Sequence, residues 1–134
     1  GARTMPLDLT NSVDTAAVEG EGMRIPLFDE TGEPYMDGET PVTALVAGTY
    51  SKRFLKAQSK ENEKLARLPG KTTEEQREKA MRNSYAACVI EWDLVAGGVM
   101  APPAPIFERK PHLYEQIVRA ANHHAAFFEA RSAS

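Results

Sequence analysis

Hydrophobic and polar positions divide the chain into three parts with different patterns. Residues 1–22 are mostly small and polar without a sustained period, which predicts a flexible N-terminal arm; residues 1–4 precede Met5 and are expected to be an appended remnant. Residues 23–48 hold two short runs of alternating pattern around a turn, which predicts a β-hairpin. Residues 51–130 follow helical spacing and predict a helical region.

Together these elements predict one domain over residues 23–134. With 134 residues in all, the chain has the usual length of a single domain. The fold class we expect is mainly α with a small N-terminal β-hairpin (α+β). The helices should form a compact bundle of about three to four.

Two helix starts can be located from capping residues. The hydroxyl of Ser51 can accept a hydrogen bond from the first turn of a helix expected over residues 51–68. Thr72 and Thr73 each stand three residues before a Glu or Gln, the spacing of a capping box, and predict a second helix that ends at Gly97. Along this helix and the last one, the residues expected in the core are Met81, Tyr85, Cys88, Val89, Trp92 and Ile117.

Proline positions determine the expected shape of the C-terminal part. Residues 102–105 contain three prolines, each of which biases the residue before it away from helical backbone angles, and they predict an extended connector. Pro111 fits the first position of a last helix that should run to about Ala130. We therefore expect one long helix at the C-terminal end.

Charge is distributed unevenly along a chain whose total is only -3. Residues 1–50 carry 2 basic and 9 acidic side chains, a balance of -7, whereas residues 51–83 carry 10 basic and 5 acidic, a balance of +5. Interspersed Lys and Glu favour solvated helix faces, although attraction between the two regions could also bring subunits together. No apolar run approaches the ~20 residues that a transmembrane helix needs, so we expect no membrane contact.

No residue pattern indicates catalysis or a cofactor. The glycines do not form a phosphate-binding loop, and Ser51 lacks the glycine-flanked elbow of a catalytic serine. His112, His123 and His124 share one predicted helix without the spacing of a zinc site, and Cys88 lies on an apolar stripe. We therefore predict a non-enzymatic protein with no metal or cofactor, whose partner or self-association surface includes Lys52, Arg53, Phe54, Tyr114, Phe127 and Phe128.

Several short motifs follow one another over residues 23–128. They are a turn with Phe28, Asp29, Gly32 and Pro34, a valine-rich run from Val42 to Gly48, a helix opened by Ser51-Lys52-Arg53, a passage with Ala87, Cys88 and Trp92, and a run from Phe107 to Ile117 followed by Asn122, Ala125 and Phe127. In this order they resemble the tail assembly chaperones of long-tailed bacteriophages, the small proteins encoded between the major tail protein and the tape measure protein.

The resemblance implies a function in phage or prophage tail morphogenesis, in the cytoplasm of the bacterial host. Several copies of such a chaperone bind the tape measure protein, help to recruit the major tail protein, and then leave. The implied partners are these two proteins and further copies of the chain itself, without nucleic acid. Two alternatives remain open: a structural virion component, such as a tail-completion or connector subunit, and a DNA-binding regulator that uses the basic residues 51–83.

Overall fold

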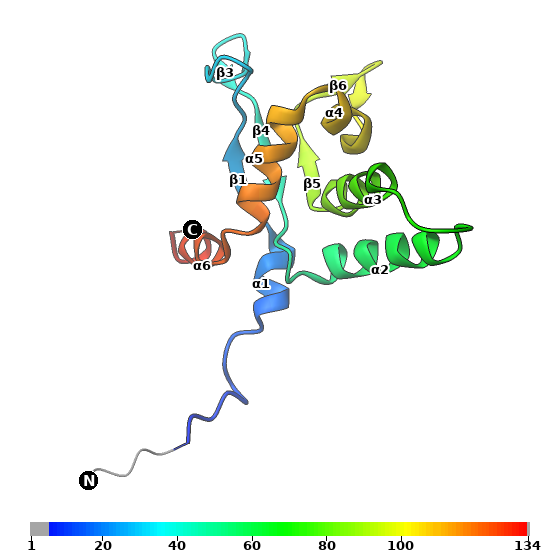
Figure 1. Cartoon of the computed structure of the whole chain (residues 1–134). Helices are drawn as coiled ribbons and strands as arrows, with labels where there is room; N and C mark the ends of the chain where they lie inside the picture. Colours follow the sequence, from blue (N-terminus) through cyan, green and yellow to red (C-terminus); the bar gives the residue numbers. More distant parts are fainter. Residues whose placement is uncertain (1–5, 134) are drawn as a thin grey trace.

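The computed structural model describes residues 6–133 and has a mixed α+β fold (Figure 1). The helices are α1 (Thr15–Glu21), α2 (Lys52–Ala66), α3 (Glu74–Ala86), α4 (Pro103–Arg109), α5 (Pro111–Ala121) and α6 (His124–Ala133). The strands are β1 (Met23–Pro26), β2 (Met36–Asp37), β3 (Thr40–Pro41), β4 (Thr43–Val46), β5 (Val89–Trp92), β6 (Val95–Ala96) and β7 (Val99–Met100). The α+β class is confirmed, but the expected bundle of three to four helices with a single hairpin is wrong.

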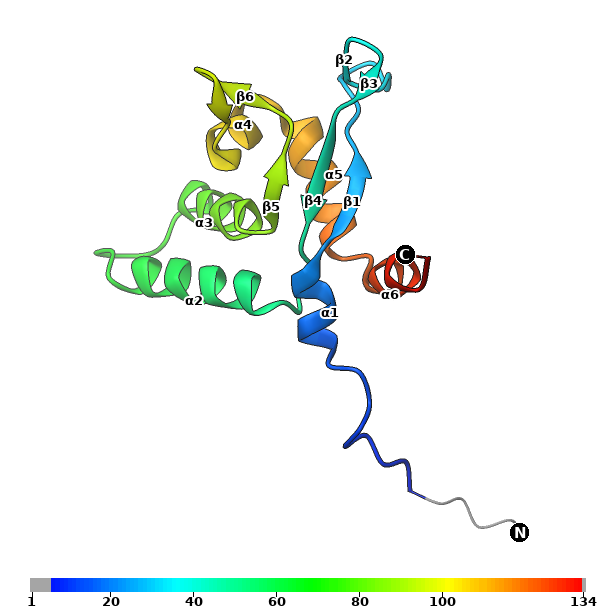
Figure 2. The same cartoon turned by 180° about the vertical axis from the view of Figure 1, so that it is seen from behind.

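An antiparallel sheet of three strands, in the order β1-β4-β5, forms the centre of the molecule. Strand β4 lies in the middle and alternates between the two faces, so that Ala44 and Val46 are buried while Thr43 and Leu45 are half-buried. Helix α5 packs across this sheet, and its Leu113 and Ile117 belong to the same core as Ala44 and Val46 (Figures 1 and 2). The sheet and the helix together define one continuous apolar core.

The hairpin expected over residues 23–48 is present, with β1 and β4 as its long arms. Between them the chain makes a turn at Asp29, whose carboxylate accepts hydrogen bonds from the backbone amides of Thr31 and Glu33 at 2.9 and 3.0 Å. A second small antiparallel pair, β2–β3, forms the tip. Local turn chemistry therefore agrees with the tertiary structure in this part of the chain.

The second predicted helix ends earlier than expected. Helix α3 stops at Ala86, and Cys88 leads directly into β5, which pairs with β4. A run such as Val89-Ile90-Glu91-Trp92 satisfies helical spacing and also has the β-branched and aromatic composition of a strand. The open edge of β4 decides between the two, because pairing satisfies backbone groups that would otherwise lack partners.

The glycine pair that was expected to end a helix is instead a hairpin turn. Gly97 and Gly98 have φ angles of 61° and 83° and connect β6 to β7, a conformation that two-residue hairpins require and other residues rarely adopt. The indole N–H of Trp92 donates a hydrogen bond of 2.8 Å to the carbonyl of Ala101, which closes this hairpin onto β5. The predicted helical region 51–130 is therefore interrupted by three strands.

Two expectations for the C-terminal part are also wrong. The proline-rich stretch is not an extended connector but the first turn of α4, because Pro103 and Pro105 occupy positions whose amides have no partner within a helix. The single long helix after Pro111 is divided into α5 and α6 at Asn122 and His123. The Asn122 side chain donates to Tyr85 Oη at 2.9 Å and accepts from Thr49 Oγ1 at 3.2 Å, so tertiary contacts hold the break in place.

Part of the expected N-terminal arm is a docked helix. Asp14 caps α1, and its residues Val18 and Glu19 are buried against the rest of the molecule. Residues 6–14 extend away from the molecule (Figures 1 and 2), while residues 1–5 lie outside the described range. A segment too short and polar to show a period can still form a helix when the tertiary structure buries one face of it.

Helices α2 and α3 form an antiparallel pair, the α2–α3 hairpin, that projects sideways from the sheet (Figure 1). Both predicted caps are present: the Phe54 amide donates to the Ser51 hydroxyl, and Thr73 forms a complete capping box with Gln76. Gly70, with a φ of 74°, lies in the short connection between them.

Candidate functional site

Residues expected to form one interaction surface are spread over several parts of the structure. Lys52 and Arg53 are exposed at the start of α2, and Tyr114 is half-buried on α5. Phe54 and Phe127 are 5% and 1% exposed, so their assignment to the surface is wrong; they belong to the interior, whereas Phe128 is exposed. The two adjacent phenylalanines therefore have different roles, since a helix turns consecutive side chains about 100° apart.

The expected core residues also separate into two groups. Cys88, Val89, Trp92 and Ile117 are all buried, and Tyr85 is half-buried. Met81 is 47% exposed, and its assignment to the core is wrong. Its apolar stripe on α3 does not all face the sheet: the N-terminal part of the stripe lines an open groove instead.

We call this feature the Met81 groove. It lies between α3 and α5, has a volume of about 460 Å³, and is lined by Met81, Tyr85, Tyr114, Glu115, Val118 and Arg119. A smaller hollow of about 180 Å³ between α2 and α3 shares Met81 with it. Met81 therefore stands at the junction of two hollows, and α3 is the wall that they have in common.

A chain of aromatic rings supports the floor of the Met81 groove. The ring of Tyr85 lies 5.1 Å from Phe54 and 5.9 Å from Tyr114, measured between centroids. Tyr114 in turn lies 5.2 Å from Phe107, which meets the edge of Trp92 at 6.0 Å. These contacts connect the groove to the buried core, so the floor is rigid while the thioether of Met81 above it can adapt to different ligand shapes.

Polar groups lie mainly at the edge of the groove. Glu115 and Arg119 are exposed on α5, one turn apart, and Arg77 borders the adjoining hollow on α3. Burial raises the pKa of the Tyr114 hydroxyl, so this group stays neutral at physiological pH. The site thus combines an apolar floor with a charged edge, an arrangement that suits the apolar face of an amphipathic helix.

The groups considered for catalysis do not converge. Burial raises the pKa of the Cys88 thiol to about 12, so the reactive thiolate is not formed at neutral pH. His112 contacts Tyr35 and Glu30 at one end of the molecule, and His124 contacts Glu19 at another. Within residues 6–133, no group of three or more His, Cys, Asp or Glu side chains is arranged to hold a metal ion.

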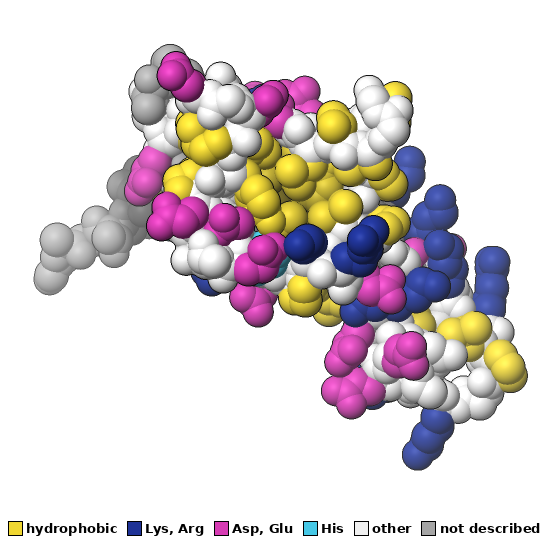
Figure 3. All heavy atoms as spheres, turned by 90° about the horizontal axis from the view of Figure 1, so that it is seen from above, with side chains coloured by type: hydrophobic (Ala, Val, Ile, Leu, Met, Phe, Trp, Pro, Cys, Tyr) yellow, Lys and Arg dark blue, Asp and Glu magenta, His cyan; other side chains and the backbone are white. Residues whose placement is uncertain are grey.

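A second apolar surface lies between the two small hairpins. Figure 3 shows hydrophobic side chains in the middle of the face seen from above, and Lys and Arg side chains toward the end formed by the α2–α3 hairpin. Val95 and Val99 are both 68% exposed, and Val95 lines a hollow of about 480 Å³ together with Asp37 and Asp93. Both charged residues of this lining are acidic, whereas the Met81 groove has one acidic and one basic residue at its edge.

Sequence reasoning missed Met81, Val118 and Arg119 as surface residues of one site. The signal for Met81 was present, because Met81 begins the stripe that continues through Tyr85 to Trp92, but a stripe does not indicate whether it faces a core or an open groove. In the described part of the chain, none of the helices has the length and apolar character required to cross a membrane. Comparisons with known protein families, with curated protein sequences and with solved structures find no match for this chain.

Proposed function

We propose that this protein is a phage tail assembly chaperone that binds the tape measure protein through the Met81 groove. The observation that supports this most directly is an open groove with an aromatic floor on a protein without a convergent catalytic group among its described residues. The order of motifs over residues 23–128 supports the same assignment. The proposed activity is non-enzymatic, and it takes place in the host cytoplasm.

Groove size and composition suit a helical ligand. A volume of about 460 Å³, with a further 180 Å³ beside it, accommodates a few apolar side chains from successive turns of a helix. Each such contact is of modest strength, because the groove is open to solvent on one side. Many copies acting along one long ligand would therefore hold it firmly and still be replaced one at a time by major tail protein subunits.

Binding should depend on Met81 and Tyr114. We expect that Met81→Asp weakens binding to a soluble, predominantly helical segment of the tape measure protein at least tenfold, because it places a charge against an apolar ligand face. Tyr114→Ala should have a similar effect by removing part of the floor. The matched control is Leu55→Asp, since Leu55 is also exposed on a helix, at 50%, but does not line the groove.

Isothermal titration calorimetry of the purified chain against that segment measures these changes. Equal loss of affinity in Leu55→Asp and Met81→Asp would remove the groove from the proposal. A wild-type chain that neither binds the tape measure protein nor keeps it soluble on co-expression would overturn the assignment itself.

The exposed valines of β6–β7 favour one alternative, a structural virion component, because a subunit that stays in the tail needs a further permanent contact. Mass spectrometry of purified virions distinguishes the two. Stoichiometric amounts in mature tails would support the structural role, whereas presence in assembly intermediates alone would support the chaperone.

A further inference from the structure

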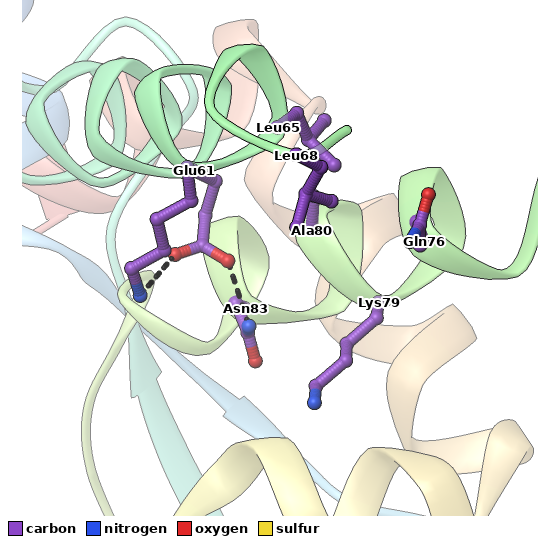
Figure 4. Close-up of a pocket in the computed structure, with 8 residues that line it drawn as sticks. Glu61, Leu65, Leu68, Gln76, Lys79, Ala80 and Asn83 are labelled. Carbon is purple, nitrogen blue, oxygen red and sulfur yellow. Dashed lines mark hydrogen bonds and ion pairs between the residues drawn. The ribbon is translucent and has the colours of Figure 1, made fainter. Parts of the chain in front are cut away.

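The α2–α3 hairpin has a second groove between its two helices (Figure 4). It shares Leu65 and Ala80 with the smaller hollow beside Met81. We call it the Leu68 groove. Its volume is about 440 Å³, and Leu65, Leu68 and Ala80 form its apolar floor. Leu68, which follows the C-cap residue of α2, remains 39% exposed. The floor thus presents apolar area to solvent.

Lysine side chains border this floor. Lys64 forms an ion pair of 3.0 Å with Glu61, whose other carboxylate oxygen accepts from Asn83 at 2.7 Å. Lys79 has neither a hydrogen bond nor an ion pair within residues 6–133, and Figure 4 shows its side chain extending without a partner. The Leu68 groove therefore offers an apolar floor with an uncompensated cation beside it.

The N-terminal segment, residues 6–13, has complementary chemistry. Leu7, Leu9 and Val13 are 83%, 64% and 55% exposed. Asp8 accepts hydrogen bonds from the Thr10 amide and hydroxyl, which lower the pKa of its carboxyl and keep it ionised. The Ser12 amide and hydroxyl donate to the Leu9 carbonyl, so residues 8–12 form a local turn that presents two leucines on either side of an acid.

We propose that Leu7, Asp8 and Leu9 of one copy dock in the Leu68 groove of a second copy. In this arrangement Leu9 lies between Leu65 and Leu68, and Asp8 pairs with Lys79. The overall charges agree with it, because residues 1–50 carry -7 and residues 51–83 carry +5 in every copy. The proposed function requires several copies on one ligand, and this contact joins them at a surface separate from the Met81 groove.

Geometry favours a second copy over the same chain. The segment ends just before α1, which contacts α2, and both views show it leading away from the α2–α3 hairpin (Figures 1 and 2). From Lys52 to Leu65 helix α2 rises about 20 Å. Residues 6–13 span at most about 27 Å, and only when fully extended. They could therefore cover the distance to the groove of their own chain only if the turn at Thr10 opened.

Disulfide trapping between two different chains tests this contact. A Leu9→Cys chain is mixed with a Leu68→Cys chain under mild oxidation, and the linked peptide is identified by mass spectrometry. Cys88 does not interfere, because it is buried and stays protonated. The matched control replaces Leu68→Cys with Leu55→Cys, since Leu55 is exposed on α2 of the same hairpin but lies outside the groove.

We expect the Leu9→Cys and Leu68→Cys chains to cross-link at least tenfold faster than the control pair. Adding Lys79→Glu to the Leu68→Cys chain should slow the reaction about fivefold, and adding Asp8→Lys to the Leu9→Cys chain should restore it. A rate equal to that of the control pair would overturn the proposal. A rate that Lys79→Glu leaves unchanged would also overturn it. The same holds if a further variant with both Leu9→Cys and Leu68→Cys forms the disulfide only within its own chain.

This experiment contains no tape measure protein. Its failure would therefore leave the proposed chaperone function untouched, and a failure of ligand binding at the Met81 groove would leave the cross-link untouched. The two proposals can be rejected independently.

Discussion

Two regions of this protein bury a glutamate in different ways. In the body, which comprises the three-stranded sheet with α1, α4, α5 and α6, Glu19 is fully buried. Its carboxylate accepts from the Tyr50 amide at 3.0 Å and contacts His124 Nδ1 at 2.7 Å, and His124 stacks on the Tyr50 ring at 3.9 Å. These contacts join α1, α6 and the start of α2 in one closely packed place.

In the α2–α3 hairpin, Glu61 occupies a shallower position. It is 8% exposed, and its ion-pair partner Lys64 is solvated. The residues that α3 buries, Ala80 and Ser84, are small or polar, and the one large apolar residue that α2 buries, Phe54, lies in its first turn. The comparison indicates that the body contributes most of the folding free energy, whereas the hairpin mainly provides exposed surfaces for contact with other molecules.

The largest loss of stability should follow from Phe107→Ala. Phe107 is 1% exposed and lies between the rings of Trp92 and Tyr114, so truncation leaves a cavity in the body worth about 3–5 kcal/mol. Urea unfolding followed by the fluorescence of Trp92, the single tryptophan, measures the change. A loss below that of the hairpin variants would contradict the ranking of the two regions.

Gly48→Ala should cost about 2–3 kcal/mol, because a Cβ at this position would collide with the Glu19 side chain. Its backbone φ is not in the left-handed region, so the effect is steric, and the three atoms nearest to the added Cβ all belong to Glu19. In a Glu19→Ala background, Gly48→Ala should therefore cost clearly less than in the wild type. Additive losses in this double-mutant cycle would contradict the proposed contact.

A smaller and local effect is expected for Glu61→Ala. Loss of the bonds to Asn83 and Lys64 should destabilise the hairpin by about 1–2 kcal/mol, and Glu61→Gln, which can keep the Asn83 bond, should cost less. Hydrogen exchange measured by mass spectrometry should show faster exchange in α2 and α3 and little change in β4. Equal acceleration in both regions would mean that the hairpin is not a separate unit of stability.

Glu61 should also make the hairpin sensitive to acid. Burial alone would raise the pKa of the Glu61 carboxyl, but the hydrogen bonds from Asn83 and Lys64 outweigh it and hold the pKa below the ordinary value of 4.5. A lowered folded pKa means that this stabilisation is present above that value and is lost as the pH falls below it. Protection of α2 and α3, measured as the exchange rate relative to the intrinsic rate at the same pH, should therefore fall at low pH in the wild type, and less so in Glu61→Gln.

The smallest effect on stability is expected at the Met81 groove. Because Met81 is 47% exposed, Met81→Gln should change the free energy of unfolding by less than about 0.5 kcal/mol. The same variant should weaken binding to the tape measure segment. Chemical denaturation and calorimetry on one preparation compare the two, and a large loss of stability would indicate that Met81 packs more tightly than its exposure suggests.

Elements that depend on neighbours in sequence could be predicted from the sequence. Ser51 and Thr73 begin helices because their side chains bond amides only three residues away, and Asp29 makes its turn in the same way. The buried state of Trp92 and Cys88 could also be predicted, since large apolar and thiol side chains favour the interior in a helix and in a strand alike.

Only the tertiary structure decided the remaining features, because each depends on a partner distant in sequence. Pairing with β4 makes Val89–Trp92 a strand, and contacts from Thr49 and Tyr85 end α5 at Asn122. The same dependence decides whether Met81 faces a core or a groove. Helix α5 contacts α3, but the space between the two helices beside Met81 stays open to solvent. Local patterns determine where elements begin, but backbone pairing and burial over long sequence distances determine what those elements become and which of their faces stay exposed.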